Sequence, residues 1–261
     1  MIEIAALLAV GAAAGLLAGL LGIGGGLVIV PAVTWLLMAQ GAGRDLAVPM
    51  AIATALGTML LTSAASAWSH ARRGNVDWQA VVRLGPAVAL GALIGGWVAS
   101  SLPGLALARV FAVLITLIGL RMLVGAGAST RAVSPGLRGW LYAGPVIGSL
   151  SALIGIGGGS FNVPYLAWNG YTVYRAVGIA AACGWPIALA GSAGFLLLGE
   201  PTQGWPNSVG YWYLPGVIAI GVTGAATSPV GARLAARVGS AGLSRLFGLF
   251  LLLVAVRMAF D

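Results

Sequence analysis

The sequence predicts an all-α polytopic membrane protein made of two inverted repeats, each a glycine-broken helix hairpin plus three transmembrane helices. Three observations lead to this prediction: the composition is strongly apolar, the apolar segments are long, and a glycine-rich segment occurs twice. Of the 261 residues, 60% are hydrophobic and 7% are charged, whereas a soluble domain is about 25% charged. This composition excludes a soluble globular protein, and a chain so apolar is not disordered.

Ten apolar segments follow one another along the chain, at residues 4–20, 27–39, 46–69, 80–100, 105–124, 138–154, 161–169, 174–198, 211–234 and 243–260. Several reach the roughly 20 residues that a helix needs to cross a hydrocarbon core. The alternating pattern of a membrane β-barrel is missing, so we predict a helix for each segment. The first segment lacks a preceding cationic region, so we do not interpret it as a signal peptide.

The chain repeats itself. Residues 15–31 (GLLAGLLGIGGGLVIVP) and 148–164 (GSLSALIGIGGGSFNVP) are identical at ten of seventeen positions. We therefore predict a first transmembrane repeat over residues 1–128 and a second, inverted repeat over 129–261. One straight helix over residues 4–39 would be about 54 Å long, so we expect a hairpin at each glycine cluster. The sequence leaves open whether these hairpins span the membrane fully or are re-entrant.

The arginines predict the orientation of the repeats. All thirteen cationic residues are arginine, and they concentrate in the 70–83, 121–138 and 233–245 stretches. Cation-rich loops lie in the cytoplasm, so segment 46–69 runs inward and its repeat partner 174–198 runs outward. We accordingly predict a multi-pass protein of the cell inner (plasma) membrane with both termini outside.

Two GIGGG motifs, each followed five residues later by a proline (Pro31 and Pro164), resemble those of the TauE/SafE family of sulfite and organosulfonate exporters. The resemblance covers both halves and nearly the whole chain. It implies a membrane transporter that exports small sulfur-containing anions, such as sulfite, sulfoacetate or related organosulfonates. The alternative is a permease or channel for another small anion or metabolite.

The glycine turns are the first candidates for substrate binding. They have no side chains to block a solute, and each next helix begins at once, so its free N–H groups and positive dipole end would face an anion. Ser160 and Asn162 replace Leu27 and Ile29 of the first copy and would add hydrogen-bonding groups. The predicted ligands are Gly24, Gly25, Gly26, Gly157, Gly158, Gly159, Ser160 and Asn162. The alternatives are a tight packing bend for GIGGG and a helix cap for Ser160.

Hydroxyl and aromatic side chains supply the remaining candidates. One helical face carries Thr54, Thr58, Thr62 and Ser66, which would line a pathway or bond between helices. Of these, Thr54 is predicted to contact the substrate, and Trp185 would contact an organic substrate body unless it serves packing. His70 is interpreted as an ordinary interfacial residue. The predicted interfacial anchors are Trp68, Trp78, Trp140, Trp205 and Trp212.

Several classes of function are disfavoured. The sequence has one histidine and one cysteine, too few for a Cys/His metal cluster, and it has no Walker or hydrolase motif. We expect no enzyme activity, no metal and no cofactor. Scattered single arginines also argue against nucleic acid, which leaves a small anion and the lipid bilayer as partners. The oligomeric state, a homodimer included, stays open.

Overall fold

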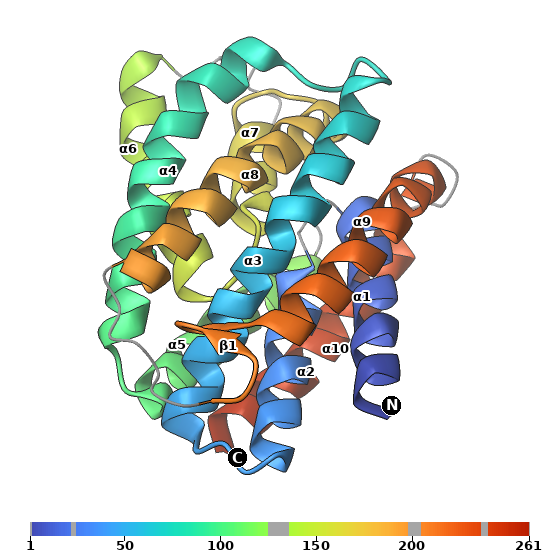
Figure 1. Ribbon diagram of the computed structural model, residues 1–261. Coiled ribbons are helices and arrows are strands. Elements are labelled where there is room, and N and C mark those ends of the chain that lie inside the picture. Colours follow the sequence, from blue (N-terminus) through green and yellow to red (C-terminus); the bar gives the residue numbers. More distant parts are fainter. Residues whose placement is uncertain (1, 22–24, 125–135, 198–204, 236–239, 261) are drawn as a thin grey trace.

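The computed structural model describes residues 2–21, 25–124, 136–197, 205–235 and 240–260, which form ten helices and one short hairpin (Figure 1). The first half contains α1 (Ile2–Leu21), α2 (Gly26–Ala39), α3 (Arg44–Ala71), α4 (Trp78–Ser101) and α5 (Gly104–Val124). The second half contains α6 (Leu137–Leu153), α7 (Gly159–Trp168), α8 (Val173–Leu197), β1 (Ser208–Val209), β2 (Trp212–Tyr213), α9 (Leu214–Ala235) and α10 (Ser240–Phe260). The predicted all-α polytopic fold is therefore confirmed.

Helix length separates the spanning helices from the broken ones. Among the described residues, six helices are long and apolar enough to cross a membrane: α1, α3, α4, α5, α8 and α9. By contrast, α2 has 14 residues and α7 has 10, which correspond to about 21 and 15 Å of helix. Neither can cross a ~30 Å hydrocarbon core, so both end inside the molecule at one of their termini.

The two halves contribute equivalent neighbours. Helix α1 packs against α9 and α6 against α4, while α3 packs against α9 and α8 against α4. Helices α3 and α8 also pack on each other, as do α5 and α10. Exchanging α1–α5 for α6–α10 leaves this set of contacts unchanged. In Figure 1 the chain climbs α3 from the bottom to the top of the view and descends along α8.

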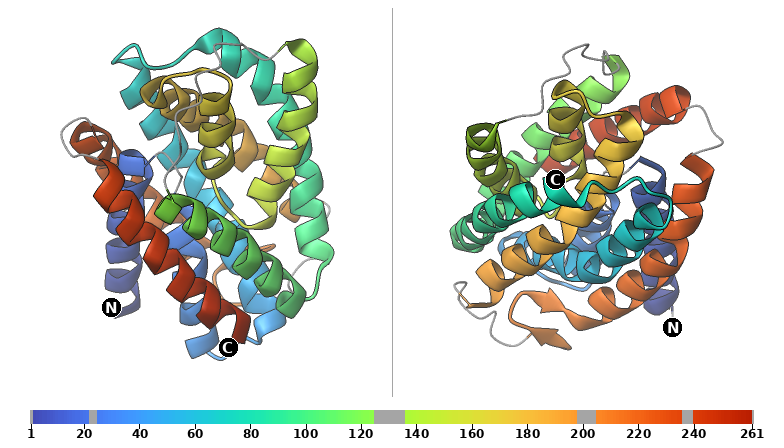
Figure 2. Two further views of the ribbon diagram at one scale, coloured as in Figure 1. Left: turned by 180° about the vertical axis from the view of Figure 1, so that it is seen from behind. Right: turned by 90° about the horizontal axis from the view of Figure 1, so that it is seen from above.

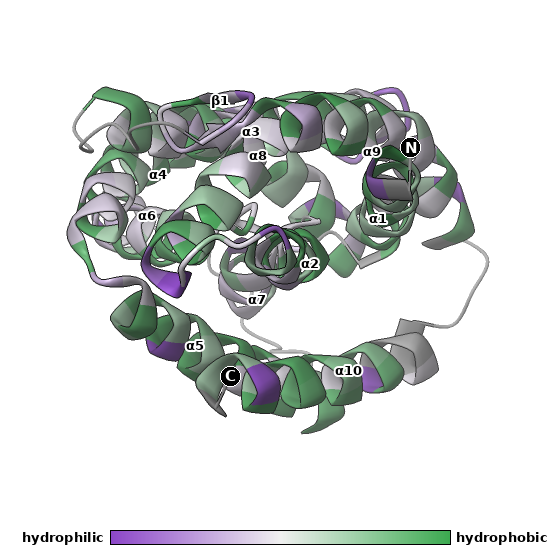
Figure 3. Cartoon of the chain, turned by 60° about the horizontal axis from the view of Figure 1, so that its bottom comes forward, coloured by the Kyte–Doolittle hydropathy of each residue, from purple (hydrophilic) through white to green (hydrophobic). Residues whose placement is uncertain are grey.

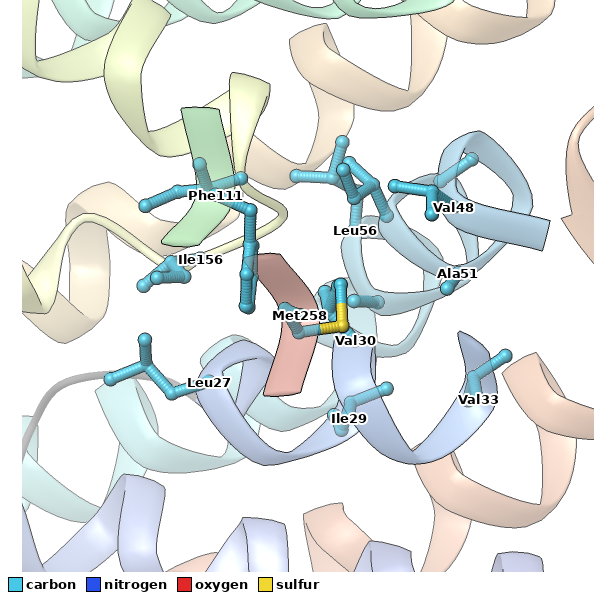
Figure 4. Packing of buried hydrophobic residues seen from close by; sticks show 14 of the residues in the cluster. Leu27, Ile29, Val30, Val33, Val48, Ala51, Leu56, Phe111, Ile156 and Met258 are labelled. Carbon is cyan, nitrogen blue, oxygen red and sulfur yellow. The ribbon is translucent and has the colours of Figure 1, made fainter. Parts of the chain in front are cut away.

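The core surrounds α2. Its side chains Leu27, Ile29 and Val33 are buried together with residues of α3, α5 and α10 (Figure 4). Figure 3 shows α5 and α10 side by side along one side of the molecule. Their inward residues Phe111 and Leu251 are buried, whereas the large apolar side chains Val113 and Leu253 are 60% and 63% exposed. An exposed apolar face of this kind suits contact with lipid.

Small residues bring the paired helices together. A Cβ atom at Gly11, Gly15 or Gly19 of α1 would overlap the backbone of α9. Across the same pair the Thr227 hydroxyl donates to the Ala12 carbonyl (3.1 Å). Across α6 and α4 the Ser149 hydroxyl likewise donates to the Gly91 carbonyl (2.9 Å). The many glycines are thus used for close helix packing, as is usual in membranes.

One expectation about a helix end is wrong, and one element of the structure was not expected. Trp140, predicted as an interfacial anchor, is 1% exposed and makes edge contacts with Tyr165 and Tyr171 (ring centroids 5.9 and 6.5 Å apart). The β1–β2 hairpin, in which Val209 pairs with Trp212, was not expected either. The burial of Trp140 depends on aromatic residues that are distant in sequence. The hairpin lies in the connection between α8 and α9, where helical periodicity gives no signal.

The α1–α9 contact predicts the effect of added volume. Replacing Gly15 with alanine should destabilise the protein by about 1–3 kcal/mol, because the new methyl group meets the Gly224 backbone, which cannot move aside. Thermal unfolding in detergent should show a melting temperature several degrees lower. Gly242→Ala in α10 is the control, because a Cβ there meets nothing within 4 Å. Equal losses in both variants would contradict the close-contact interpretation.

Candidate functional site

The two glycine turns meet inside the molecule. A Cβ atom at Gly26, the first residue of α2, would overlap the carbonyl oxygen of Gly155 and lie 3.0 Å from the Cα of Ile156. Gly155 itself has a φ of +64°, a conformation that favours glycine. The N-terminus of α2 is therefore covered by the backbone of the second turn. Gly24 lies outside the described residues.

A cavity lies beside the second turn. It has a volume of about 20 Å³, which corresponds to about one water molecule. Its polar wall is formed by Thr62, Ser63 and Ser66 of α3. The rest of the wall consists of small residues from α1, the second turn, α7 and α8: Ala18, Gly157, Gly159, Ala180, Ala181 and Gly184. The hydroxyls of α3 therefore face a backbone that is largely bare of side chains.

The first turn of α7 carries polar groups without partners. Ser160 is 7% exposed and Asn162 is fully buried, and neither side chain has a hydrogen-bond partner among the described residues. No side-chain hydrogen bond caps α7, whose cap residue is Gly158, so Ser160 is not the cap. Leaving a buried donor or acceptor unpaired costs about 1–3 kcal/mol. Gly159 of the same turn lines the cavity, so these unpartnered groups remain candidates for ligand binding.

Two of the sequence-predicted residues lie away from the cavity. The Thr54 hydroxyl accepts a hydrogen bond from the Tyr213 backbone N–H (3.0 Å), about two helical turns from Thr62. Trp185 is 44% exposed and does not line the cavity. Within the threonine stripe, the Thr58 hydroxyl donates to the Ala55 carbonyl of its own helix (2.7 Å). The hydroxyls of the stripe thus have different contacts. Thr54 bonds to β2, Thr58 bonds to its own helix, and Thr62 and Ser66 line the cavity.

Other residues of the cavity had no signal in the sequence. Ser63 lies one position outside the i, i+4 stripe, yet a Cβ at Gly184 would come within 2.7 Å of its hydroxyl oxygen. Ser63 therefore faces α8 across the cavity. The alanines and glycines of the wall carry no chemical group that would have marked them. Only the pairing of α3 with α8 brings them together.

Polar contacts tie helices together at the end of the molecule where α3 begins. The Tyr213 hydroxyl donates to the Glu3 carboxylate, which links β2 to α1. The Asp45 carboxylate accepts from the Gly104 N–H (2.7 Å), and Arg44 donates to the Met258 carbonyl (2.7 Å). The start of α1 and the end of α10 lie toward this same end (Figure 2).

At the opposite end of α3, His70 differs from its predicted role. It is 4% exposed, and neither ring nitrogen has a hydrogen-bond partner among the described residues. The interpretation as an ordinary interfacial residue is therefore wrong. The periodicity of α3 could not show this, because the burial of a residue in the last helical turn depends on how neighbouring segments pack.

The apolar helices and the two broken hairpins define a polytopic membrane protein, in which a small cavity with a neutral polar wall lies beside the second turn. A family model described as "Sulfite exporter TauE/SafE" matches residues 7–258. The chain belongs to the TauE/SafE family of membrane transporters. The resemblance carried by the two GIGGG motifs is therefore confirmed.

Relatives support the same class. A probable membrane transporter protein of Haemophilus influenzae is 37% identical over 255 residues, which cover 96% of each chain. Another, from Methanocaldococcus jannaschii, is 29% identical over 214 residues, or 80% of this chain and 78% of the relative. A third, from Bacillus subtilis, is 27% identical over 179 residues, or 60% and 65%. No solved structure matches the chain significantly.

The Glu3–Tyr213 contact predicts a pH-dependent stability. Burial and the Glu3 carboxylate raise the pKa of Tyr213 from 10.0 to about 12. A raised pKa stabilises the folded state fully below pH 10, and this contribution is lost as the pH rises from about 10 to 12. Tyr213→Phe should lower the melting temperature at pH 8, and the gap to the unsubstituted protein should narrow above pH 10. Tyr142→Phe is the control, since Tyr142 is 77% exposed; a gap that stays constant with pH would contradict the assignment.

Proposed function

We propose that this transporter exports small sulfur-containing anions, such as sulfite, sulfoacetate or related organosulfonates, and binds them in the cavity at the second glycine turn. The observation that carries the proposal is the combination of three cavity hydroxyls with two polar side chains in the first turn of α7, Ser160 and Asn162, which have no hydrogen-bond partner among the described residues. The family model's description supports the substrate class. The first GIGGG turn then contributes packing rather than a second open site.

The chemistry of the wall suits an oxyanion. A sulfite or sulfonate group has three oxygens that accept hydrogen bonds, and hydroxyls and an amide can donate to them. The positive end of the α7 dipole adds a favourable potential at the same place. No arginine is among the described residues that line the cavity, so a bound anion is attracted there without being held by a full opposite charge. Weak binding of this kind lets the substrate leave again.

The cavity is small. Its volume of about 20 Å³ has room for about one water molecule, so we propose that its walls separate before substrate enters. We propose that the units over residues 1–128 and 129–261 are inverted repeats that move relative to each other. The set of helix contacts stays the same when α1–α5 are exchanged for α6–α10, and this symmetry supports the proposal of two repeats. Many transporters alternate access by moving one repeat against the other around a fixed site.

The charges support an orientation for export. The end of α3 is followed by Arg72 and Arg73, and Arg138 and Arg175 lie in the first turns of α6 and α8. We propose that this end faces the cytoplasm of an inner-membrane protein and that both termini lie outside, in accordance with the positive-inside rule. The cavity residues Thr62–Ser66 lie toward this end of α3, which suits loading from the cytoplasm.

A neutral metabolite is the second candidate substrate. Hydroxyl-rich walls without a charged side chain also suit a small uncharged molecule, and this favours a permease over a strict anion exporter. Flux measured with sulfite, sulfoacetate and a neutral solute such as glycerol in the same proteoliposomes separates the two functions. Transport of the neutral solute alone would reject the proposed substrate class.

Asn162 provides a test of the site. Asn162→Leu should reduce sulfite and sulfoacetate flux at least tenfold, because it removes an unpartnered donor and acceptor from the first turn of α7, whose Gly159 lines the cavity. The melting temperature should stay equal or rise, because the variant no longer buries an unpaired amide. Thr58→Val is the matched control: Thr58 is equally buried but bonds only its own helix. Unchanged flux in Asn162→Leu would remove this residue from the site.

Membrane potential should suffice as the driving force. The carboxylates of the described helices lie at helix ends, with Glu3 and Asp45 in first turns and Asp77 capping α4, whereas proton-coupled carriers usually place acids within the membrane. A potential of 100 mV favours loss of one negative charge by about 2.3 kcal/mol. Liposomes with a potassium diffusion potential and no pH gradient should therefore export a monovalent sulfonate. Flux that appears only with a pH gradient would contradict this.

A further inference from the structure

His70 is buried at the end of α3, and its imidazole ring has no hydrogen-bond partner among the described residues. It lies in the last turn of the helix, is 4% exposed, and neither Nδ1 nor Nε2 has a hydrogen-bond partner among the described residues. Two unpaired ring nitrogens in a buried position are costly, because a lone buried donor or acceptor loses its hydration without compensation. A transient partner for these atoms would remove that cost.

The position of His70 continues the polar wall of the cavity. Ser63, Ser66 and His70 are separated by three and four residues, so they share one face of α3. Ser63 and Ser66 line the cavity, and His70 lies one turn further along, a rise of about 6 Å. Any solute that moves along this face between the cavity and the end of α3 must pass the imidazole.

The segment after α3 folds back and covers the end of the helix. The backbone N–H groups of Arg73 and Asn75 both donate to the His70 carbonyl (3.1 Å each). The chain turns at Gly74, where φ is +70°, and the Asn75 carbonyl then rests against Gly178 of α8, with no room for a Cβ there. This covering segment therefore packs against α8 five residues beyond His70.

Arginines flank this covering segment on its outer side. Arg72 and Arg73 are both exposed, and the Arg72 guanidinium stacks over the Trp68 ring at 4.0 Å. Two cations at the exposed end of α3 raise the local concentration of anions there. From the exposed end of α3 toward the cavity, the groups that follow one another are therefore two arginines, one buried imidazole and the cavity hydroxyls.

We propose that His70 is a second anion-binding position, through which the substrate passes between the arginine-bearing end and the cavity. The inference rests on the proposed function. An imidazole N–H donates to an oxyanion that has shed part of its hydration, and the ion then moves on to Ser66 one turn away. An uncharged donor, unlike a buried arginine, adds little to the barrier for leaving.

Inside-out membrane vesicles test this position from the cytoplasmic face, with sulfite and sulfoacetate as probes. His70→Leu should raise KM at least tenfold while maximal flux falls less, because the donor is lost and the bulk is kept. His70→Gln, which retains an N–H donor, should stay within about threefold of the unsubstituted protein. Trp78→Leu, an exposed aromatic residue at the start of α4, should leave KM unchanged.

The outcomes separate the two proposals. An unchanged KM in His70→Leu, or an equal rise in His70→Gln, overturns the role of His70 and leaves the proposed function intact. If the unsubstituted protein takes up neither anion, the proposed function is overturned and the His70 role with it. A measurement without substitution guards against a misfolded variant. Because the chain has a single histidine, its ring ¹⁵N resonances in untagged protein must shift on titration with sulfoacetate; constant resonances overturn the proposal.

Discussion

The contact between the two glycine turns constrains the rest of the molecule. The first residue of α2 lies directly against the Gly155 carbonyl, and a side chain at Gly26 would separate the two backbones. Because the turns meet inside the bundle, α2 and α7 are short and the long helices α3 and α8 flank them on both sides. The central position of these turns also places the N-termini of α2 and α7 deep in the molecule, with the hydroxyls of α3 beside the second turn.

The two copies of the motif differ in polarity around this contact. In the first copy, Leu27 and Ile29 are buried in the apolar core and the helix N-terminus is covered. In the second, Ser160 and Asn162 occupy the equivalent positions and remain unpaired, and a cavity opens beside Gly157 and Gly159. Apolar residues in place of this serine and asparagine would make a more stable bundle. Their presence fits a site that is kept free for a ligand at a cost in stability.

Much of the fold could be predicted from the sequence, because helix length, apolar runs and the repeated glycine cluster are local signals. The glycine break at 155–159 and the short α7 after it were predicted on this basis. The candidate site was predictable only in part. Ser160 was recognisable by comparing the two copies, whereas Thr54 and Ser63 could not be told apart, since one faces β2 and the other faces Gly184 of α8. Such choices depend on which distant element packs alongside.

The two ends of the molecule differ in what holds them closed. At the end where α3 begins, charged groups bond across helices, with Glu3 bonded to Tyr213 and Asp45 to the Gly104 N–H. Hydrogen bonds to charged groups contribute about 1.5–3 kcal/mol each. At the other end, Asn75 packs on Gly178, and the hydrogen bonds of the covering segment run back to its own helix. Among the described residues, moving α8 away from α3 at that end therefore breaks packing and leaves these backbone hydrogen bonds intact.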